Sequence, residues 1–179
     1  MVNSSIDLPS NTQTPLQVHV NRNGFKESLH GVDIAVCDAD GSVILGMGDV
    51  ESIIFPRSAM KPLQSIALIE LLNSSSDIPE FSEAEVALIC ASHNGETLHT
   101  EAVTKLLGKF DISIDELTCG AHWSMDQKTM ISQVRSMDKP HKVHNNCSGK
   151  HAGMLILSKL INGNTSSYAK LANVCQQQI

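Results

Sequence analysis

The chain has 179 residues and a formal net charge of -6 at pH 7. This length suits one domain of ordinary size, and a composition of 41% hydrophobic but only 3% aromatic residues predicts an aliphatic core. Nucleic-acid binding requires a basic face, so the negative charge argues against it. The sequence has no long basic run, which argues equally against an anionic membrane surface.

The N-terminal region carries no targeting signal that we can identify. No apolar stretch approaches the roughly 20 residues of a membrane helix. Residues 1–15 contain neither an apolar segment nor a Lys or Arg, so a secretory signal is not expected and we interpret them as a disordered tail. The five cysteines are odd in number and widely spaced, unlike a secreted disulfide framework, so we expect a cytoplasmic protein.

The first part of the sequence favours strands. Residues 17–21 alternate in polarity, and residues 31–47 predict a hairpin that turns at Asp40-Gly41. A further extended piece is expected over residues 52–55. From Ser58 the pattern changes, because apolar residues recur at helical spacing from Leu63 to Leu72.

The second part favours helices. Ser82 and Glu85 form a capping box that predicts a helix through residue 91, and another helix is expected over residues 98–107. Residues 112–123 are expected to be irregular or partly extended. A polar helix over 126–136 and a strongly apolar helix over 151–161, ended by Asn162-Gly163, complete this part.

The last segment has the apolar pattern of one more helix, from Tyr168 to Ile179, with no stop signal after it. This pattern predicts that the chain is a fragment of a longer protein. An exposed apolar face on such a helix would favour aggregation or association with another chain.

Ser58 and Lys61 are the first candidates for chemistry. Positions i and i+3 are neighbours on a helix, so the amine can reach the hydroxyl. A serine attacks only when a base takes its proton, and a lysine can be that base when burial or a nearby cation favours its neutral form. Arg57 could be this cation or could bind a substrate carboxylate. Alternatively, Ser58 caps the helix and Lys61 faces solvent.

Two further motifs follow. SHN at residues 92–94 is similar to the second element of penicillin-binding proteins and β-lactamases, whose third element, K-T-G, does not occur here; a polar turn is the alternative. HNNCSGKHAG places four potential metal ligands within eight residues: His144, Cys147, Lys150 and His151. It lacks a paired cysteine, so its spacing favours a free cysteine before a helix.

The blocks FPRSAMKPLQ, CASHNGE, CGAHW and HNNCSGKHAGML, in this order and spacing, resemble the L-asparaginase II family, typified by the inducible rhizobial enzyme. The resemblance covers nearly all of residues 17–179. It implies an α+β fold, with an antiparallel sheet flanked by helices, similar to the serine β-lactamases and penicillin-binding proteins. It also implies hydrolysis of L-asparagine to L-aspartate and ammonia, and a homodimer in the full-length family.

The resemblance assigns the catalytic residues. Ser58 and Lys61 match the first Ser-Lys pair of the family, and Ser92 matches the serine of the second pair. We expect acyl transfer through a serine, with Lys61 as the base. Ser58 is favoured as the nucleophile because a helix N-terminus stabilises a developing anion, but Ser92 remains open.

The resemblance also assigns binding residues. Arg57 falls where the family holds its substrate, and we add the neighbours His93 and Asn94 to the substrate-binding set. Cys147 and Lys150 match two zinc ligands beside the active site, which replaces the interpretation of Cys147 as a free thiol. Zinc is expected to order the site rather than to attack the substrate.

Members of this family are longer than this chain, so we expect residues 16–179 to be the N-terminal portion of the domain. The C-terminal half would supply the lysine paired with Ser92, a further cysteine for the metal and an acidic substrate-binding residue. Two alternatives therefore stay open. The chain could be an inactive fragment that binds zinc or a partner half, or a β-lactamase-like peptidase or esterase.

Overall fold

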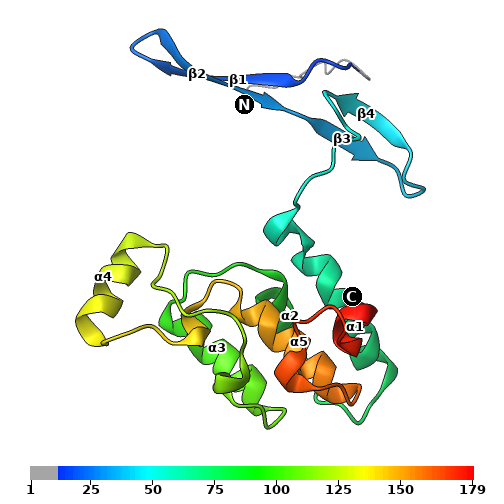
Figure 1. The fold of residues 1–179 in the computed structure, drawn as a ribbon, viewed down its shortest axis with the longest axis vertical. Helices are drawn as coiled ribbons and strands as arrows, with labels where there is room; N and C mark the ends of the chain where they lie inside the picture. Colours follow the sequence, from blue (N-terminus) through cyan, green and yellow to red (C-terminus); the bar gives the residue numbers. More distant parts are fainter. Residues whose placement is uncertain (1–11) are drawn as a thin grey trace. The chain divides into compact units, whose positions relative to one another are not determined.

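The computed structural model describes residues 12–179, which divide into two compact units on either side of the Phe55-Pro56 bond. All strands assigned within these residues lie in the first unit and all helices in the second (Figure 1). The α+β class predicted from the sequence is therefore confirmed. Most of the predicted tail, residues 1–11, lies outside the described residues.

The first unit consists of two antiparallel hairpins. Their strands are β1 (Leu16–Arg22) paired with β2 (Phe25–Val32), and β3 (Ile34–Cys37) paired with β4 (Val43–Met47). The second hairpin confirms the prediction, and the Asp38 carboxylate closes its turn by accepting the N–H groups of Asp40 and Ser42. The first hairpin was not predicted as a unit, although it turns at Asn23-Gly24, which has φ of 49° and 80° and is a typical hairpin turn.

Two boundaries of the first unit differ from expectation. Residues 52–55, expected to be extended, are assigned to no strand. Thr12, within the segment interpreted as a tail, forms a bridge to the second hairpin: its N–H donates to Gly46 O at 2.9 Å, and Gly48 N–H donates to Thr12 O at 2.9 Å. These two bonds attach residue 12 to β4.

The second unit is helical. Its α-helices are α1 (Lys61–Ser74), α2 (Glu83–Cys90), α3 (Thr97–Gly108), α4 (Gln127–Ser136), α5 (Ser148–Leu160) and α6 (Val174–Gln178). The 3₁₀ helices are η1 (Arg57–Met60), η2 (Ile114–Glu116), η3 (Lys142–His144) and η4 (Thr165–Ser167). Within residues 12–179, no helix has both the length and the apolar character needed to cross a membrane.

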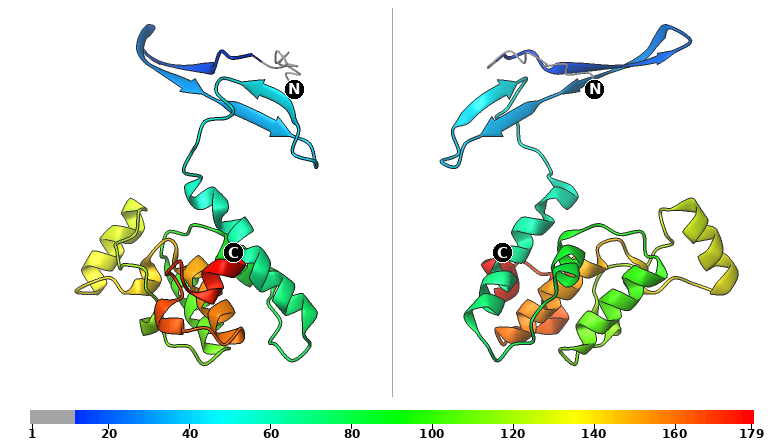
Figure 2. Two further views of the ribbon diagram at one scale, coloured as in Figure 1. Left: turned by 45° about the vertical axis from the view of Figure 1, so that its right-hand side comes forward. Right: turned by 180° about the vertical axis from the view of Figure 1, so that it is seen from behind.

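Helix α5 is the centre of this unit and packs against α1, α2, α3 and α6 (Figure 2). Its buried face is aliphatic, as the composition predicts, and Leu155 and Ile156 are fully buried. Near its N-terminus, Gly149 faces the Leu88 carbonyl of α2 so closely that a Cβ atom could not fit between them. The start of α5 is thereby held against the end of α2, and the loops beside these two helix ends meet.

The predicted terminal helix is wrong over its first half, because α6 covers only Val174–Gln178. Asn173 starts this helix by accepting the N–H of Cys175. Tyr168, which was expected on an exposed apolar face, is instead fully buried together with Cys175, whereas Leu171 is exposed. The Tyr168 hydroxyl accepts the Thr118 N–H and bonds His151, so polar contacts draw this ring into the core.

Candidate active site

Three side chains from separate segments of the second unit form one hydrogen-bonded chain. Ser58 comes from η1, Lys61 from the first residue of α1, and Ser92 from the loop after α2. Lys61 Nζ lies 2.6 Å from Ser92 Oγ, and Ser92 Oγ lies 2.9 Å from Ser58 Oγ. The order is therefore Lys61–Ser92–Ser58, with Ser92 in the middle.

The environment of Lys61 differs from that of a surface lysine. Its side chain is only 2% exposed, and its amine donates to Ala91 O at 2.8 Å and faces Asn146 O at 3.5 Å. None of the ion pairs found among residues 12–179 involves this amine. Ser58 does not cap α1 either, because the N-cap residue is Met60. The alternative of a capping serine and a solvated lysine is therefore wrong.

Arg57 precedes the Ser58 hydroxyl and has an unusual backbone. Its φ of 52° lies in the left-handed region, which residues other than glycine seldom adopt. Such strained conformations concentrate at functional sites, where the surrounding structure maintains them. The side chain of Arg57 is exposed.

His93 and Asn94, both predicted to bind substrate, lie differently. Asn94 is exposed beside Ser92, whereas His93 is buried. The His93 Nδ1 atom accepts the Gly95 N–H at 3.0 Å, so the proton of the neutral ring is on Nε2, 2.9 Å from Ser148 Oγ. Burial, with a smaller contribution from the neighbouring His99, lowers the pKa of His93 to about 4. The ring therefore connects the Ser92 loop to the start of α5.

Residues 91–95 are also held by their backbone. The His93 N–H donates to Asn146 O at 3.2 Å, and this carbonyl also faces Lys61. Gly95 has a φ of 67°, and a Cβ atom there would lie 2.5 Å from His144 O. The loop that carries Ser92 is therefore packed directly against residues 144–146.

His122 is a member of this network that sequence reasoning did not assign. Its Nδ1 atom donates to Trp123 O at 2.7 Å, which leaves Nε2 to accept the Asn146 N–H at 3.2 Å. The CGAHW block was the available signal for His122. Asn146 acts through its main chain, so its residue type gave no signal for its contact with Lys61.

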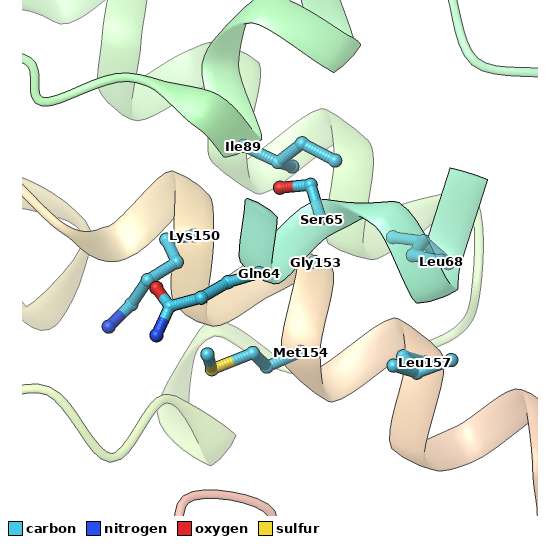
Figure 3. A pocket seen from close by; sticks show the side chains of 8 residues that line it. All are labelled: Gln64, Ser65, Leu68, Ile89, Lys150, Gly153, Met154 and Leu157. Carbon is cyan, nitrogen blue, oxygen red and sulfur yellow. The ribbon is translucent and has the colours of Figure 1, made fainter. Parts of the chain in front are cut away.

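The predicted zinc ligands supply two donors. Cys147 is the N-cap residue of α5, and Lys150 follows in the first turn. Lys150 lines a narrow pocket between α1 and α5, where it extends to the same side as Gln64 (Figure 3). The two nearby histidines are bonded elsewhere: His144 Nδ1 accepts the His141 N–H, and His151 Nδ1 lies 2.7 Å from Tyr168 Oη.

This donor set does not complete a zinc site. Structural zinc takes four ligands, and catalytic zinc takes three from the protein. Across the described part of the chain, no group of three His, Cys, Asp or Glu side chains is placed to hold a metal ion. Cys147 and Lys150 alone do not fit a resident zinc ion, and zinc binding stays a prediction.

A buried amine bonded to a serine pair is a site suited to acyl transfer. The sequence profile of the family described as L-asparaginase II matches residues 18–179. The chain belongs to this family, whose description is that of a hydrolase of asparagine. No curated protein matches the chain.

Proposed function

We propose that the chain hydrolyses the side-chain amide of L-asparagine to L-aspartate and ammonia through a serine ester. The observation that supports this most directly is the chain Lys61–Ser92–Ser58, with steps of 2.6 and 2.9 Å. Family membership supports asparagine as the substrate. The homodimer stays a prediction from the resemblance, and the cytoplasmic location stays a prediction from the number and spacing of the cysteines.

In the proposed first step, the neutral Lys61 amine accepts the proton of Ser92 while Ser92 takes the proton of Ser58. The Ser58 oxygen then attacks the amide carbon of the substrate, and the C–N bond breaks after the nitrogen receives a proton back through Ser92. Ammonia departs, and the substrate remains bound to Ser58 as an aspartyl ester. Water, deprotonated along the same chain, attacks this ester and releases aspartate.

Ser92 is the alternative nucleophile, since its hydroxyl is the one in direct contact with the amine. We favour Ser58 because it lies at the start of the continuous η1–α1 helical segment, where the positive end of the helix dipole stabilises a developing anion. In this assignment Ser92 relays the proton. Arg57, which precedes Ser58 and is exposed, would bind the substrate carboxylate.

The test measures ammonia release from L-asparagine by the 179-residue chain and by its Ser58→Ala and Ser92→Ala variants. We expect both variants to lose activity. The matched control is Ser74→Ala at the opposite end of α1, where the hydroxyl bonds only the Leu71 carbonyl and activity should be retained. A folded wild-type chain with no turnover would overturn the proposal and favour a chain that binds without catalysis.

The nucleophile is identified by covalent labelling. An asparagine analogue with a diazoketone in place of the amide alkylates the attacking oxygen, and peptide mass spectrometry locates the adduct. We expect the label on Ser58, with little labelling of the Lys61→Met variant. A label on Ser92 would show that the amine activates its direct neighbour and that Ser58 has another role.

A further inference from the structure

The side chain of Gln133 joins two loops of the site from a helix that is otherwise peripheral. Helix α4 projects from the rest of the helical unit (Figure 1), and its apolar residues Ile131 and Val134 are exposed. Gln133 is the exception, since it is only 6% exposed. A buried carboxamide on a projecting helix must have its polar atoms satisfied, and here both are.

The two atoms of this carboxamide bond two different segments. Its Nε2 donates to Gly95 O at 2.8 Å, and its Oε1 accepts the Ser124 N–H at 2.9 Å. Gly95 ends the loop that carries Ser92. Ser124 follows Trp123, whose carbonyl accepts from His122 Nδ1, and His122 Nε2 in turn accepts the Asn146 N–H.

The main chain of Gly95 connects the bond from Gln133 to the Lys61–Ser92–Ser58 chain. Its N–H donates to His93 Nδ1, and the His93 N–H donates to Asn146 O, which also faces Lys61 Nζ. The loop has little freedom to adjust, because the His144 carbonyl closes the space beside Gly95. Ser92 lies near the N-terminal end of the loop 91–95, and Gly95 lies at its C-terminal end. The bond from Gln133 to Gly95 O therefore holds the end of the loop opposite Ser92.

We propose that Gln133 is a positioning residue for the Ser92 loop. This inference rests on the proposed function. A hydroxyl that relays a proton between two partners tolerates little displacement, since a shift of about 1 Å can cost up to 100-fold in rate. The carboxamide acts on the rate through the loop and makes no contact with Ser92, Ser58 or Lys61 itself.

The kinetic test compares Gln133→Ala and the isosteric Gln133→Glu with the matched control Gln127→Ala, the same deletion at an exposed position of α4. Above neutral pH the carboxylate of Gln133→Glu still accepts from Ser124 but has no hydrogen for Gly95 O. We expect both Gln133 variants to lower kcat by about 10- to 100-fold with KM changed little, and Gln127→Ala to retain wild-type kcat. Wild-type kcat in Gln133→Glu would overturn the proposal, because packing alone would then suffice.

A second measurement separates this inference from the proposed function. Amide hydrogen exchange is followed at His93 and Gly95, whose N–H groups report on the loop whether or not the chain turns over. We expect faster exchange at both amides in Gln133→Ala and Gln133→Glu, with unchanged exchange in Gln127→Ala and in the centre of α5. Unchanged exchange at His93 and Gly95 would overturn the positioning role. Faster exchange in a chain that releases no ammonia would leave the positioning role in place and overturn only the asparaginase assignment.

Discussion

The amine of Lys61 bonds the hydroxyl of Ser92, 31 positions further along the chain, at 2.6 Å. The sequence separation of three residues had pointed to Ser58 as its partner. The structure instead places Ser92 between the amine and Ser58, so helix α1 and the loop after α2 contribute to one hydrogen-bonded chain. The two Ser-containing motifs thereby become one site.

Replacing Lys61 by methionine tests whether the amine is needed. The substitution keeps the length of a side chain that is 2% exposed and removes the group that bonds Ser92. We expect ammonia release to fall by about 10³-fold, the usual range for loss of a general base, while the chain stays folded by circular dichroism.

The matched control is Lys159→Met. The Lys159 amine also donates to main-chain carbonyls, those of Phe110 and Asp111, but it lies near the C-terminal end of α5. We expect its activity to equal that of the wild type. If both variants lost activity alike, loss of a lysine anywhere in the unit would be the cause, and Lys61 would lose its special role.

Gly95→Ala should destabilise the chain and displace the Ser92 loop. The residue has a φ of 67°, and the new Cβ atom would lie 2.5 Å from the His144 carbonyl oxygen. Left-handed backbone alone costs about 1–2 kcal/mol for a residue with a Cβ atom, and the clash adds to this. Urea unfolding of Gly120→Ala gives the comparison, since a Cβ there meets nothing within 4 Å. Equal stability of the two variants would contradict the close packing of residues 95 and 144.

Local patterns predicted most helices of the second unit. The capping box of Ser82 and Glu85 starts α2 as expected, and the Asp126 side chain starts α4 by accepting the Thr129 N–H. The prediction of the final helix was wrong over its first half, because helical spacing of apolar residues can also occur in turns. Tyr168 is buried by contacts with Thr118 and His151, which are distant in sequence and give no local signal.

The residues of the site were easier to predict than their connections. Ser58, Lys61 and Ser92 were found from motifs and a family resemblance, but the order Lys61–Ser92–Ser58 depends on how α2 meets α5. That meeting rests on Gly149 facing the Leu88 carbonyl and on the main-chain bond that the His93 N–H donates to Asn146 O. Main-chain groups are the same in nearly all residue types, so contacts of this kind cannot be predicted from the sequence.

Thiol labelling should separate the exposed Cys37 from the buried Cys119 and Cys175. Burial raises the pKa of both Cys119 and Cys175 to about 11, and both thiols are shielded from reagent. Cys37 is exposed. With a disulfide reagent at pH 8, we expect Cys37 to react first and Cys119 and Cys175 to react only after denaturation. Rapid labelling of Cys175 in the folded chain would contradict the burial of α6 against α5.

Equimolar zinc should not protect Cys147 from labelling. The described residues offer Cys147 and Lys150 as donors, and two ligands leave half of a tetrahedral shell to water. We expect zinc equimolar with the chain to leave the labelling rate of Cys147 unchanged, and a Lys150→Met variant to behave alike. Full protection at equimolar zinc, lost in Lys150→Met, would show that further donors assemble around these two.

Stability should fall as the pH decreases from about 6.5 towards 4. Burial lowers the pKa of both His93 and His151 to about 4 in the folded chain, whereas unfolded histidine titrates near 6.5. Between these values the unfolded chain binds more protons than the folded chain, so the free energy of unfolding decreases as protons are added. The contribution is fully present well above pH 6.5 and is lost as the pH falls towards 4, where His93 and the partly exposed His151 become protonated in the folded chain.

Urea unfolding of the wild type and of His151→Gln at pH 7.5 and 5 measures this effect. We expect the variant to lose less stability than the wild type over this interval, because one of the two depressed titrations is absent. His30→Gln is the matched control, since this histidine is exposed on β2 and should leave the pH dependence unchanged. A wild-type stability that is constant between pH 7.5 and 5 would mean that His93 and His151 are not buried as neutral rings.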